Sequence, residues 1–412
     1  MRVTVIGINS TPEPTGIAPY TSRMAAGLQE RGHEVSVVTA FPHYPQWRVA
    51  EGYSGRTMRE VVEGVSVTRM RHFVPSTPVG LARARSEISF GWASTTRSWG
   101  DPDVVVCVSP ALLSTAMSML RARGGRAKPA IGVVMQDLYS AGISETEGGS
   151  GAVGRVFRRL ESRVARRADG VAVIHDRFRD RVVSDLGVDP DRVTVIRNWT
   201  HVEPVVGLDR AATRASLGWR DDETIVLHTG AMGEKQDLGN VVEAAREVDR
   251  VGAAVRFVLM GDGGQRGNLE AQAAGVRSIE FLDPVAGDRY PHVLASADLL
   301  LVNERPGLVE MAVPSKLTSY FNTGLPVLAA TNQASTTADE IRASGAGEIT
   351  AAGDPAALVA KVVAVTSDPD WARALGAAGP DYCAGVLSEK VALDAYDRWV
   401  RSLHSARHER QR

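Results

Sequence analysis

Two lysines and several glycines occupy loops in which a phosphate could bind. In the segment TGAMGEKQDL, Gly230 and Gly233 follow a strand-like run. Lys235 comes next, just before a helical segment that begins near Asp237. Glycines let a backbone approach a ligand closely, and a lysine beside a helix N-terminus favours an anion. The spacing is not that of an ATPase phosphate loop. We therefore predict a phosphate site here, with a ligand-free turn as the alternative.

A second lysine stands in a similar place later in the chain. In the segment VPSKLTSYFNTGLPV, Pro314 or Ser315 can open a helix with Lys316 in its first turn. A cation there opposes the helix dipole, so an anionic ligand would explain it. A third loop, MGDGG, contains Gly261 and Gly263. Each loop follows a strand, so we expect all three at the carboxyl edge of one parallel sheet.

The first half of the chain offers different chemistry. A turn rich in proline and glycine follows the first strand, and a helix is expected from about Gly16. The turn lacks the G-x-G-x-x-G pattern, which disfavours a dinucleotide-binding oxidoreductase. His43, in FPHYPQW, follows the second strand and could face a ligand, although a lone histidine is more often structural. The Gln136–Asp137 pair also follows a strand.

The elements that must position these residues alternate between strand and helix. Strand-like runs are predicted at 2–8, 34–39, 104–108, 131–135, 171–174, 193–196, 224–228, 255–260, 278–282, 298–302 and 326–330. Helical segments separate most of them, which indicates parallel sheets covered on both faces. Two such series predict an α/β protein with two doubly wound, Rossmann-like domains. We expect a hinge near 198–208 and a terminal helix from Ser388.

Composition excludes several classes of protein. Among 412 residues, 44% are hydrophobic and 23% are charged, which is ordinary for a globular protein. No apolar run is long enough to span a membrane, and the first ten residues do not resemble a secretory signal, so we expect a cytoplasmic protein. Two cysteines support neither a disulfide framework nor a cysteine-based metal site. Three Asp-Pro-Asp triplets favour turns rather than a metal site.

Charge is distributed unevenly along the chain. Residues 1–200 contain 26 basic and 19 acidic side chains, whereas residues 201–412 contain 21 and 29. The predicted helix 152–168 carries six arginines and an apolar stripe at helical spacing. A solvated basic face is the plain interpretation of that helix. Contact with an anionic acceptor or with the inner face of the membrane is the alternative.

Taken together, these segments resemble the retaining glycosyltransferases of family 4, which have the GT-B fold, and in particular the colanic-acid-type branch. The resemblance is carried by PEPTGIAPYT, TAFPHYPQW, TGAMGEKQDL and VPSKLTSYFNTGLPV, and by Asn198–Trp199. It implies two Rossmann-like domains that face each other across a cleft. Residues 1–200, completed by the helical segment 388–412, would bind the acceptor. Residues 201–387 would bind a nucleotide-diphosphate sugar.

The resemblance also implies roles for the candidate residues. Lys235, Lys316 and His43 are expected to be catalytic. The expected donor-binding residues are Gly230, Gly233, Glu234, Gln236, Gly261, Gly263, Glu310, Pro314, Ser315 and Ser319. The expected acceptor-binding residues are Thr15, Gly16, Tyr20, Gln136 and Asp137. No metal or cofactor is expected, because lysines and backbone N–H groups can stabilise the leaving diphosphate. Expected partners are a nucleotide sugar and a glycan, lipid-linked sugar or small-metabolite acceptor, with peripheral membrane contact and no nucleic acid.

Two departures from the family pattern keep other functions open. Many members have an arginine where this chain has Ala231, and two glutamates where it has Met311 and Ser319. A hydroxyl at 319 would hold a ribose more weakly than a carboxylate. A non-catalytic protein that binds nucleotide sugars and a sugar-nucleotide epimerase therefore remain alternatives.

Overall fold

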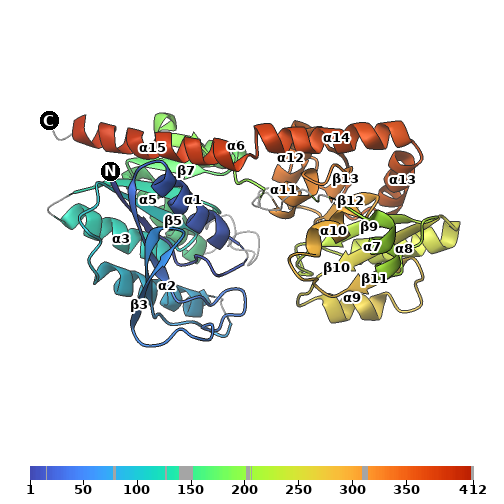
Figure 1. Cartoon of the computed structure of the whole chain (residues 1–412), viewed down its shortest axis with the longest axis horizontal. Coiled ribbons are helices and arrows are strands. Elements are labelled where there is room, and N and C mark those ends of the chain that lie inside the picture. The colour runs from blue at the N-terminus through green and yellow to red at the C-terminus, as the bar shows by residue number, and fades with distance from the viewer. Residues whose placement is uncertain are drawn as a thin grey trace. The chain divides into compact units, whose positions relative to one another are not determined.

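The chain forms two compact units. The computed structural model describes residues 1–14, 16–77, 80–125, 128–138, 152–200, 205, 207–308 and 314–409. The first unit comprises Met1–Asn198 together with Lys390–Arg412, and the second comprises Trp199–Glu389 (Figure 1). The chain therefore returns to the first unit at its end. Each unit is built around one sheet.

The first unit contains an eight-stranded sheet in the order β3-β4-β2-β1-β5-β6-β7-β8. All neighbouring pairs are parallel except β3 and β4. The strands are β1 (Arg2–Ile6), β2 (Glu34–Ala40), β3 (Thr57–Val62), β4 (Val65–Met70), β5 (Val104–Ser109), β6 (Ala130–Met135), β7 (Gly170–Val173) and β8 (Val193–Val195). The central strands β5 and β6 are buried along their whole length, as expected for a sheet covered on both faces.

The hairpin of β3 and β4 was not among the predicted strands. Glu63 and Gly64 join the two strands, and both have positive φ angles, of 51° and 78°. Two consecutive positive φ angles are typical of the tight turns that connect antiparallel strands. β3 lies at the edge of the sheet and contains no fully buried residue, so its hydrophobic signal is weak.

Helices cover both faces of this sheet. The helices α2 (Gly80–Thr95), α3 (Leu112–Gly124) and α5 (Ala152–Arg167) all belong to connections that run across the sheet toward β8. Right-handed crossovers place such helices on the same face. Indeed, α2 packs on α3, and α3 packs on α5. The connection through α1 (Ala18–Glu30) runs the other way, so α1 covers the opposite face.

The last helix, α15 (Glu389–Glu409), completes the first unit on the face that α1 covers. A Cβ atom at Gly132 in β6 would lie 2.5 Å from the Trp399 ring, and one at Gly170 in β7 would lie 2.7 Å from Leu403. A Cβ atom at Gly27 in α1 would lie 2.6 Å from Leu393. Glycines at these three positions thus let α15 approach closely. The remaining helix of this unit, α6 (Asp176–Ser184), is capped by His175, whose Nδ1 accepts from the N–H of Arg177.

The second unit contains a six-stranded parallel sheet in the order β11-β10-β9-β12-β13-β14. The strands are β9 (Thr224–Thr229), β10 (Val255–Met260), β11 (Ile279–Leu282), β12 (Leu299–Asn303), β13 (Val327–Thr331) and β14 (Gly347–Ala351). The last of these was not predicted. The helices are α7 (Arg210–Leu217), α8 (Gly239–Val251), α9 (Arg266–Gln272), α10 (Tyr290–Ala295), α11 (Lys316–Phe321), α12 (Thr336–Ser344), α13 (Pro355–Thr366) and α14 (Pro369–Gly385). A buried apolar cluster lies on each face of the sheet.

Each sheet has a point at which the direction of chain winding reverses. In the first unit this point lies between β1 and β5, and in the second it lies between β9 and β12. Loops leave such a point in opposite directions, and a crevice opens at the carboxyl ends of the strands. The two topologies therefore indicate where each unit binds a ligand.

Candidate active site

In the second unit, the loops that follow β9 and β10 pack backbone against backbone. The N–H of Gly230 donates to the carbonyl of Met260, and the N–H of Met232 donates to the carbonyl of Asp262. A Cβ atom at Gly261 would lie 1.9 Å from the Gly230 carbonyl oxygen. One at Gly263 would lie 2.5 Å from the Met232 carbonyl oxygen. These two glycines, predicted as ligand contacts, are therefore required first of all by the packing of the loops.

The loop that carries Lys235 is attached to the end of β12. The carbonyl of Lys235 accepts from the N–H of Arg305 (2.9 Å). The side-chain amide of Asn303 donates to the carbonyl of Gln236 (2.8 Å). Within the loop, the N–H of Gly233 donates to the Gln236 side chain (3.1 Å). Lys235 is half-buried and Glu234 is exposed. The loops after β9 and β12 thus meet at the reversal point of the sheet.

Lys316 extends to the same place from the start of α11. Its Nζ lies 3.7 Å from the position that a Cβ atom of Gly230 would occupy, and Gly230 has a φ of 108° that favours glycine. The ammonium donates to Nε2 of the buried His228 (3.1 Å). The other ring nitrogen, Nδ1, lies 3.1 Å from the carbonyl oxygen of Leu301 and donates to it. His228 is therefore the neutral tautomer with its proton on Nδ1.

Burial controls the charges of this pair. Burial lowers the pKa of Lys316 to about 7, and the nearby carboxylate of Glu304 partly opposes that change. Burial, followed by the charge of Lys316, holds the pKa of His228 well below its ordinary value. Among the described residues, no carboxylate lies within ion-pair distance of the Lys316 ammonium. An anion bound beside Gly230 would supply the missing partner and would favour the protonated lysine.

Glu304 is a feature that the sequence patterns did not reveal. It follows β12, and its carboxylate accepts hydrogen bonds from the hydroxyls of Thr331 and Thr337. The carboxylate held in this way opposes the lowering of the pKa of Lys316. A single glutamate after a strand has no distinctive spacing, and only the fold brings it near a lysine that lies twelve positions later in the chain.

The remaining predicted donor residues lie in varied surroundings. Pro314 is half-buried, Ser315 is exposed, and Ser319 is buried within α11. Glu310 lies outside the described residues. Next to Ser319, the hydroxyl of Tyr320 accepts from the N–H of Thr229 (2.8 Å) and so fixes α11 to the end of β9. This contact places Lys316 over Gly230.

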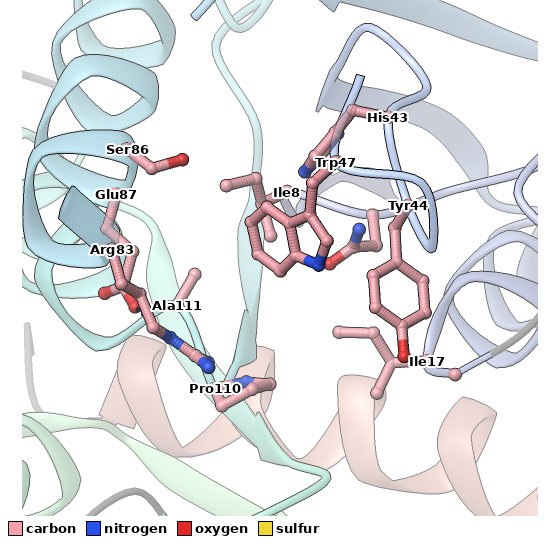
Figure 2. A pocket seen from close by; sticks show the side chains of 12 residues that line it. Ile8, Ile17, His43, Tyr44, Trp47, Arg83, Ser86, Glu87, Pro110 and Ala111 are labelled. Carbon is pink, nitrogen blue, oxygen red and sulfur yellow. Dashed lines mark hydrogen bonds and ion pairs between the residues drawn. The ribbon is translucent and has the colours of Figure 1, made fainter. Parts of the chain in front are cut away.

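The first unit has a pocket at the reversal point of its own sheet. Its volume is about 210 Å³. The segments after β1, β2 and β5 supply much of its lining, and α2 supplies one wall (Figure 2). The lining residues are Ile8, Asn9, Gly16, Ile17, His43, Tyr44, Trp47, Arg83, Ser86, Glu87, Pro110 and Ala111. The pocket therefore combines aromatic rings with carboxylate, hydroxyl, imidazole and guanidinium groups.

A buried carboxylate positions the histidine of this pocket. Oε1 of Glu13 accepts from the backbone N–H groups of His43 (2.8 Å) and Tyr44 (2.9 Å), and lies 3.2 Å from Nδ1 of His43. The other oxygen of Glu13 accepts from Asn9 (2.8 Å). Nδ1 of His43 also lies 3.0 Å from the carbonyl oxygen of Phe41. Two acceptors at Nδ1 favour the proton there, which leaves Nε2 as a hydrogen-bond acceptor.

The opposite wall of the pocket is formed by α2. Figure 2 shows Arg83, Ser86 and Glu87 across the pocket from His43 and Trp47. Glu87 is buried, and burial raises the pKa of its carboxyl, although it accepts from the N–H of Leu113 (3.0 Å). The buried hydroxyl of Ser86 has no hydrogen-bond partner in the described chain. A ligand with hydroxyl groups could satisfy both side chains.

The predicted acceptor residues divide into two groups. Gly16 lines this pocket, as does His43, which was expected to be catalytic. Tyr20 is buried in α1, and Gln136 accepts from the side-chain amide of Asn198 (2.9 Å), so neither belongs to the pocket lining. Asp137 is exposed and is likewise not part of the lining, and Thr15 lies outside the described residues.

The sequence analysis did not identify Glu13, Ser86 or Glu87. Glu13 lies in the proline-rich turn, and the other two lie in an ordinary helix. No spacing rule separates such carboxylates and hydroxyls from surface residues. The only available signal was the position of the turn after the first strand.

Two family models match the chain. One, described as a glycosyl transferase 4-like domain, matches residues 15–199. The other, described as glycosyl transferases group 1, matches residues 223–368. The Escherichia coli K12 protein WcaI, by name a colanic acid biosynthesis glycosyl transferase, is 32% identical over 79% of this chain and 82% of its own length.

Solved structures show the same architecture. Sucrose-phosphate synthase from Thermosynechococcus elongatus superposes with a TM-score of 0.74 at 15% identity, over 98% of this chain and all of that chain. Anabaena HepE in complex with UDP and glucose superposes with a TM-score of 0.71 at 15% identity, with the same coverage. At this level of identity, these structures establish the fold alone.

Proposed function

The chain belongs to the glycosyltransferases of family 4 with the GT-B fold, and from this premise we propose that it moves a sugar from a nucleoside-diphosphate donor to an acceptor hydroxyl with retention of anomeric configuration. The donor would bind at the reversal point of the second unit, and the acceptor would bind in the pocket of the first. The observation that carries the proposal is the ammonium of Lys316, held beside Gly230 by His228 with no carboxylate in contact among the described residues.

Lys316 and Lys235 would stabilise the leaving diphosphate. The bond between the anomeric carbon and the phosphate oxygen breaks, and a bond forms between that carbon and the acceptor oxygen. The acceptor proton passes to the departing phosphate oxygen, so the products are a glycoside and a nucleoside diphosphate. Negative charge grows on the diphosphate as the bond breaks. Fixed cations directed at a growing charge are commonly the largest catalytic contribution.

The pocket of the first unit suits a polyhydroxylated acceptor. Trp47 and Tyr44 offer apolar ring surface, and Ser86, Glu87 and Nε2 of His43 offer groups that exchange hydrogen bonds with hydroxyls. His43 would accept a hydrogen bond from an acceptor hydroxyl and orient it. WcaI is named for colanic acid biosynthesis, and HepE was solved with UDP and glucose. We extend this to a role in the synthesis of a cell-surface polysaccharide, a glycolipid or a glycosylated metabolite.

We also propose that the acceptor is anionic or held at a membrane surface, and that the protein works at the inner face of the membrane. The excess of basic residues in the first half supports this proposal. Within the described residues, no helix has the length and apolar character needed to cross a bilayer.

Thermal shift with UDP-, GDP- and TDP-sugars tests donor binding, because a ligand that binds only the folded state raises Tm. Turnover assays with Lys235→Ala and Lys316→Ala then test the mechanism. Each substitution should reduce turnover about 100-fold or more, which is roughly 3 kcal/mol. The double variant should lose less than the product of the single losses, because both lysines act on one charge.

Lys390→Ala is the matched control, since Lys390 is exposed and lies in α15. The control should keep normal turnover. If Lys316→Ala turned over normally at saturating donor, the catalytic assignment would be wrong. Conversion of the donor to an epimer without acceptor would identify an epimerase, and donor binding with no turnover across an acceptor panel would identify a non-catalytic protein.

A further inference from the structure

The outward face of α2 carries a stripe of apolar side chains. Leu81, Ile88 and Trp92 are 90%, 49% and 68% exposed, and their spacing of seven and four residues aligns them along one side of the helix. Among the seven tryptophans of the chain, Trp92 alone is exposed. The exposed Arg85 lies on the same side between Leu81 and Ile88, so this side of the helix combines apolar side chains with a positive charge. Exposed apolar side chains gathered in this way mark a binding surface. The pocket-lining residues Ser86 and Glu87 lie on the other side of the same helix.

The helices beside α2 add positive charge to this surface. The helices α2, α3 and α5 share one face of the sheet and together contain ten arginines and two glutamates. Both glutamates, Glu87 and Glu161, are buried. All six arginines of α5 are exposed. We call the outer surface of the three helices the α2–α3–α5 face. Its positive charge comes mainly from α5, because Arg83 pairs with Glu87 and Arg123 pairs with Asp169.

An apolar groove lies between α3 and α5 on this face. Its volume is about 400 Å³. Apolar side chains form most of its lining, and three arginines are among the lining residues. These residues are Ala116, Met119, Leu120, Arg123, Leu160, Arg163, Val164 and Arg167. Leu120 is 66% exposed, and Val156, which precedes Leu160 by about one turn of α5, is 60% exposed. Five of the eleven exposed large apolar side chains in the described residues thus lie on the three helices of this face.

We propose that the α2–α3–α5 face binds the surface of an anionic phospholipid bilayer. Trp92, Leu81 and Ile88 insert at the level of the headgroups, the arginines contact lipid phosphates, and the α3–α5 groove accommodates the acyl part of a lipid. Basic helices with exposed apolar residues bind membranes through both contributions. A nucleic acid would use the arginines but would leave the apolar stripe and the groove in water.

The arrangement of α2 links this surface to the acceptor pocket. One side of the helix would lie on the bilayer while the other side forms a wall of the pocket. A helix with its side chains is about 10–12 Å across. The polar head of a lipid held in that bilayer is therefore the class of acceptor that the pocket is placed to receive. This last step rests on the proposed transfer reaction, whereas bilayer binding requires neither donor nor turnover.

Vesicle flotation of the full chain at low salt tests the proposal. The vesicles consist of phosphatidylcholine with about 30% phosphatidylglycerol. The protein should float with these vesicles and should be released near 1 M salt, where electrostatic attraction extends only about 3 Å. Pure phosphatidylcholine vesicles should retain much less. Brominated lipids should quench the fluorescence of the wild type, and Trp92→Phe should lose most of that quenching. Absence of binding to the anionic vesicles, or equal binding to neutral ones, would overturn the proposal.

Two matched sets of variants locate the surface. Arg158→Gln, Arg159→Gln and Arg163→Gln together should weaken vesicle binding about 100-fold, since each arginine near an anionic surface contributes about fivefold. The control set Arg277→Gln, Arg373→Gln and Arg398→Gln removes three exposed arginines from elsewhere and should retain binding. Leu81→Ser with Trp92→Ser should weaken binding at least tenfold, whereas Val251→Ser, at a 52% exposed position of α8, should not.

The melting temperature and the donor-induced thermal shift of each variant show whether it is folded. Equal losses in the test and control sets would assign binding to net charge and would contradict the proposed surface. A variant that no longer binds vesicles yet shows the normal donor shift separates the membrane proposal from the proposed reaction. If the protein binds vesicles normally but binds no donor, the proposed reaction is contradicted and the proposed membrane surface is retained.

Discussion

At the scale of single residues, Lys316 and His228 form a pair in which only the lysine can carry charge. The imidazole accepts from the ammonium through Nε2 and donates through Nδ1 to Leu301, so protonation of His228 would break the contact. The lysine itself has a pKa lowered to about 7 by burial. The unliganded site is therefore poised between the neutral amine and the ammonium near neutral pH. A bound diphosphate would shift it to the ammonium.

Donor affinity should consequently depend on pH. Below pH 7 Lys316 is protonated and attracts the diphosphate, whereas above pH 7 a proton must be taken up on binding. The dissociation constant of the donor should rise toward tenfold per pH unit between pH 7 and 9. In Lys316→Arg the guanidinium stays charged, so the constant should be nearly independent of pH over this range. Calorimetric titrations at several pH values measure both. An equal slope in both proteins would exclude Lys316 as the titrating group.

The same lowered pKa has a cost for folding. Between about pH 7 and 10 the unfolded chain keeps the Lys316 proton that the folded chain lacks, so the contribution of this group makes stability rise with pH in that window. Lys316→Met removes the group and should raise the Tm of the unliganded protein at pH 6. A Tm that falls at pH 6 would mean that the ammonium stabilises the fold, contrary to its burial.

In the first unit, the carboxylate of Glu13 helps to position His43. Glu13→Gln keeps one oxygen for the N–H groups of His43 and Tyr44 but replaces the oxygen that accepts from Asn9 by an NH2 group, which cannot accept, and it removes the negative charge beside Nδ1 of His43. We expect a KM for the acceptor raised about tenfold with a smaller change in kcat, because the histidine is displaced but present. His43→Ala should affect acceptor use still more. Donor binding should be unchanged in both variants. A weakened donor shift would contradict the assignment of this pocket to the acceptor.

At the scale of elements, the glycine loops of the second unit show that one residue type can serve two purposes. Sequence patterns predicted that these glycines let a ligand approach, and Gly230, with its positive φ beside Lys316, fits that interpretation. Gly261 and Gly263 instead meet the backbone of the neighbouring loop. A sequence motif cannot distinguish a glycine that a ligand approaches from a glycine that a neighbouring backbone approaches, because both situations leave no room for a Cβ atom.

Substitutions at two glycines of the same loop should therefore differ sharply. Gly261→Ala places a methyl group 1.9 Å from the Gly230 carbonyl oxygen, so the loop must move. We expect a loss of about 3 kcal/mol or more and a Tm lower by roughly 6–12 °C. At Gly264 nothing lies within 4 Å of an added Cβ atom, so Gly264→Ala is the control and should change Tm little. Calorimetry compares the two directly. Similar melting temperatures would contradict the packing argument.

Most strands were predictable because a strand buried on both faces is rich in valine, leucine and other apolar residues. The runs 104–108 and 255–260 of the sequence match β5 and β10 closely. The strands that escaped prediction, β3, β4 and β14, lie at or near sheet edges, where polar residues interrupt the pattern. The site was predictable only where a loop follows a buried strand. Glu13, Glu87 and Glu304 could not be predicted, since their neighbours come from distant parts of the chain.

At the scale of the whole molecule, the first unit depends on the far end of the chain. The helix α15 buries Leu393, Tyr396, Trp399, Val400 and Leu403 in that unit. At about 1.5–3 kcal/mol for each side chain, their combined burial is on the order of 10 kcal/mol. That is comparable to the total stability of a domain. The sequence analysis expected a terminal helix here, but the glycines that receive it became apparent only from the packing.

In a chain that ends at Glu389, the first unit should therefore unfold while the second unit stays folded. Hydrogen exchange should be fast in β6 and β7 of the first unit, while β9, β10 and β12 keep their protection. A chain that ends at Glu409 keeps all of α15 and is the control. Mass spectrometry of peptides from each sheet after exchange compares the two truncations. Full protection of β6 and β7 in the shorter chain would show that α15 is dispensable to the first unit.

The return of α15 to the first unit also has a consequence in time. A ribosome completes residues 1–198 long before it reaches Lys390. At about 5–20 residues per second, roughly 10–40 seconds pass while residues 199–389 are made. During that interval the nascent first unit lacks the helix that covers Gly132 and Gly170. The apolar sheet face around these two glycines is therefore exposed to solvent. The second unit, whose residues are contiguous, can finish folding before the first, and the order of maturation is then the reverse of the order of synthesis.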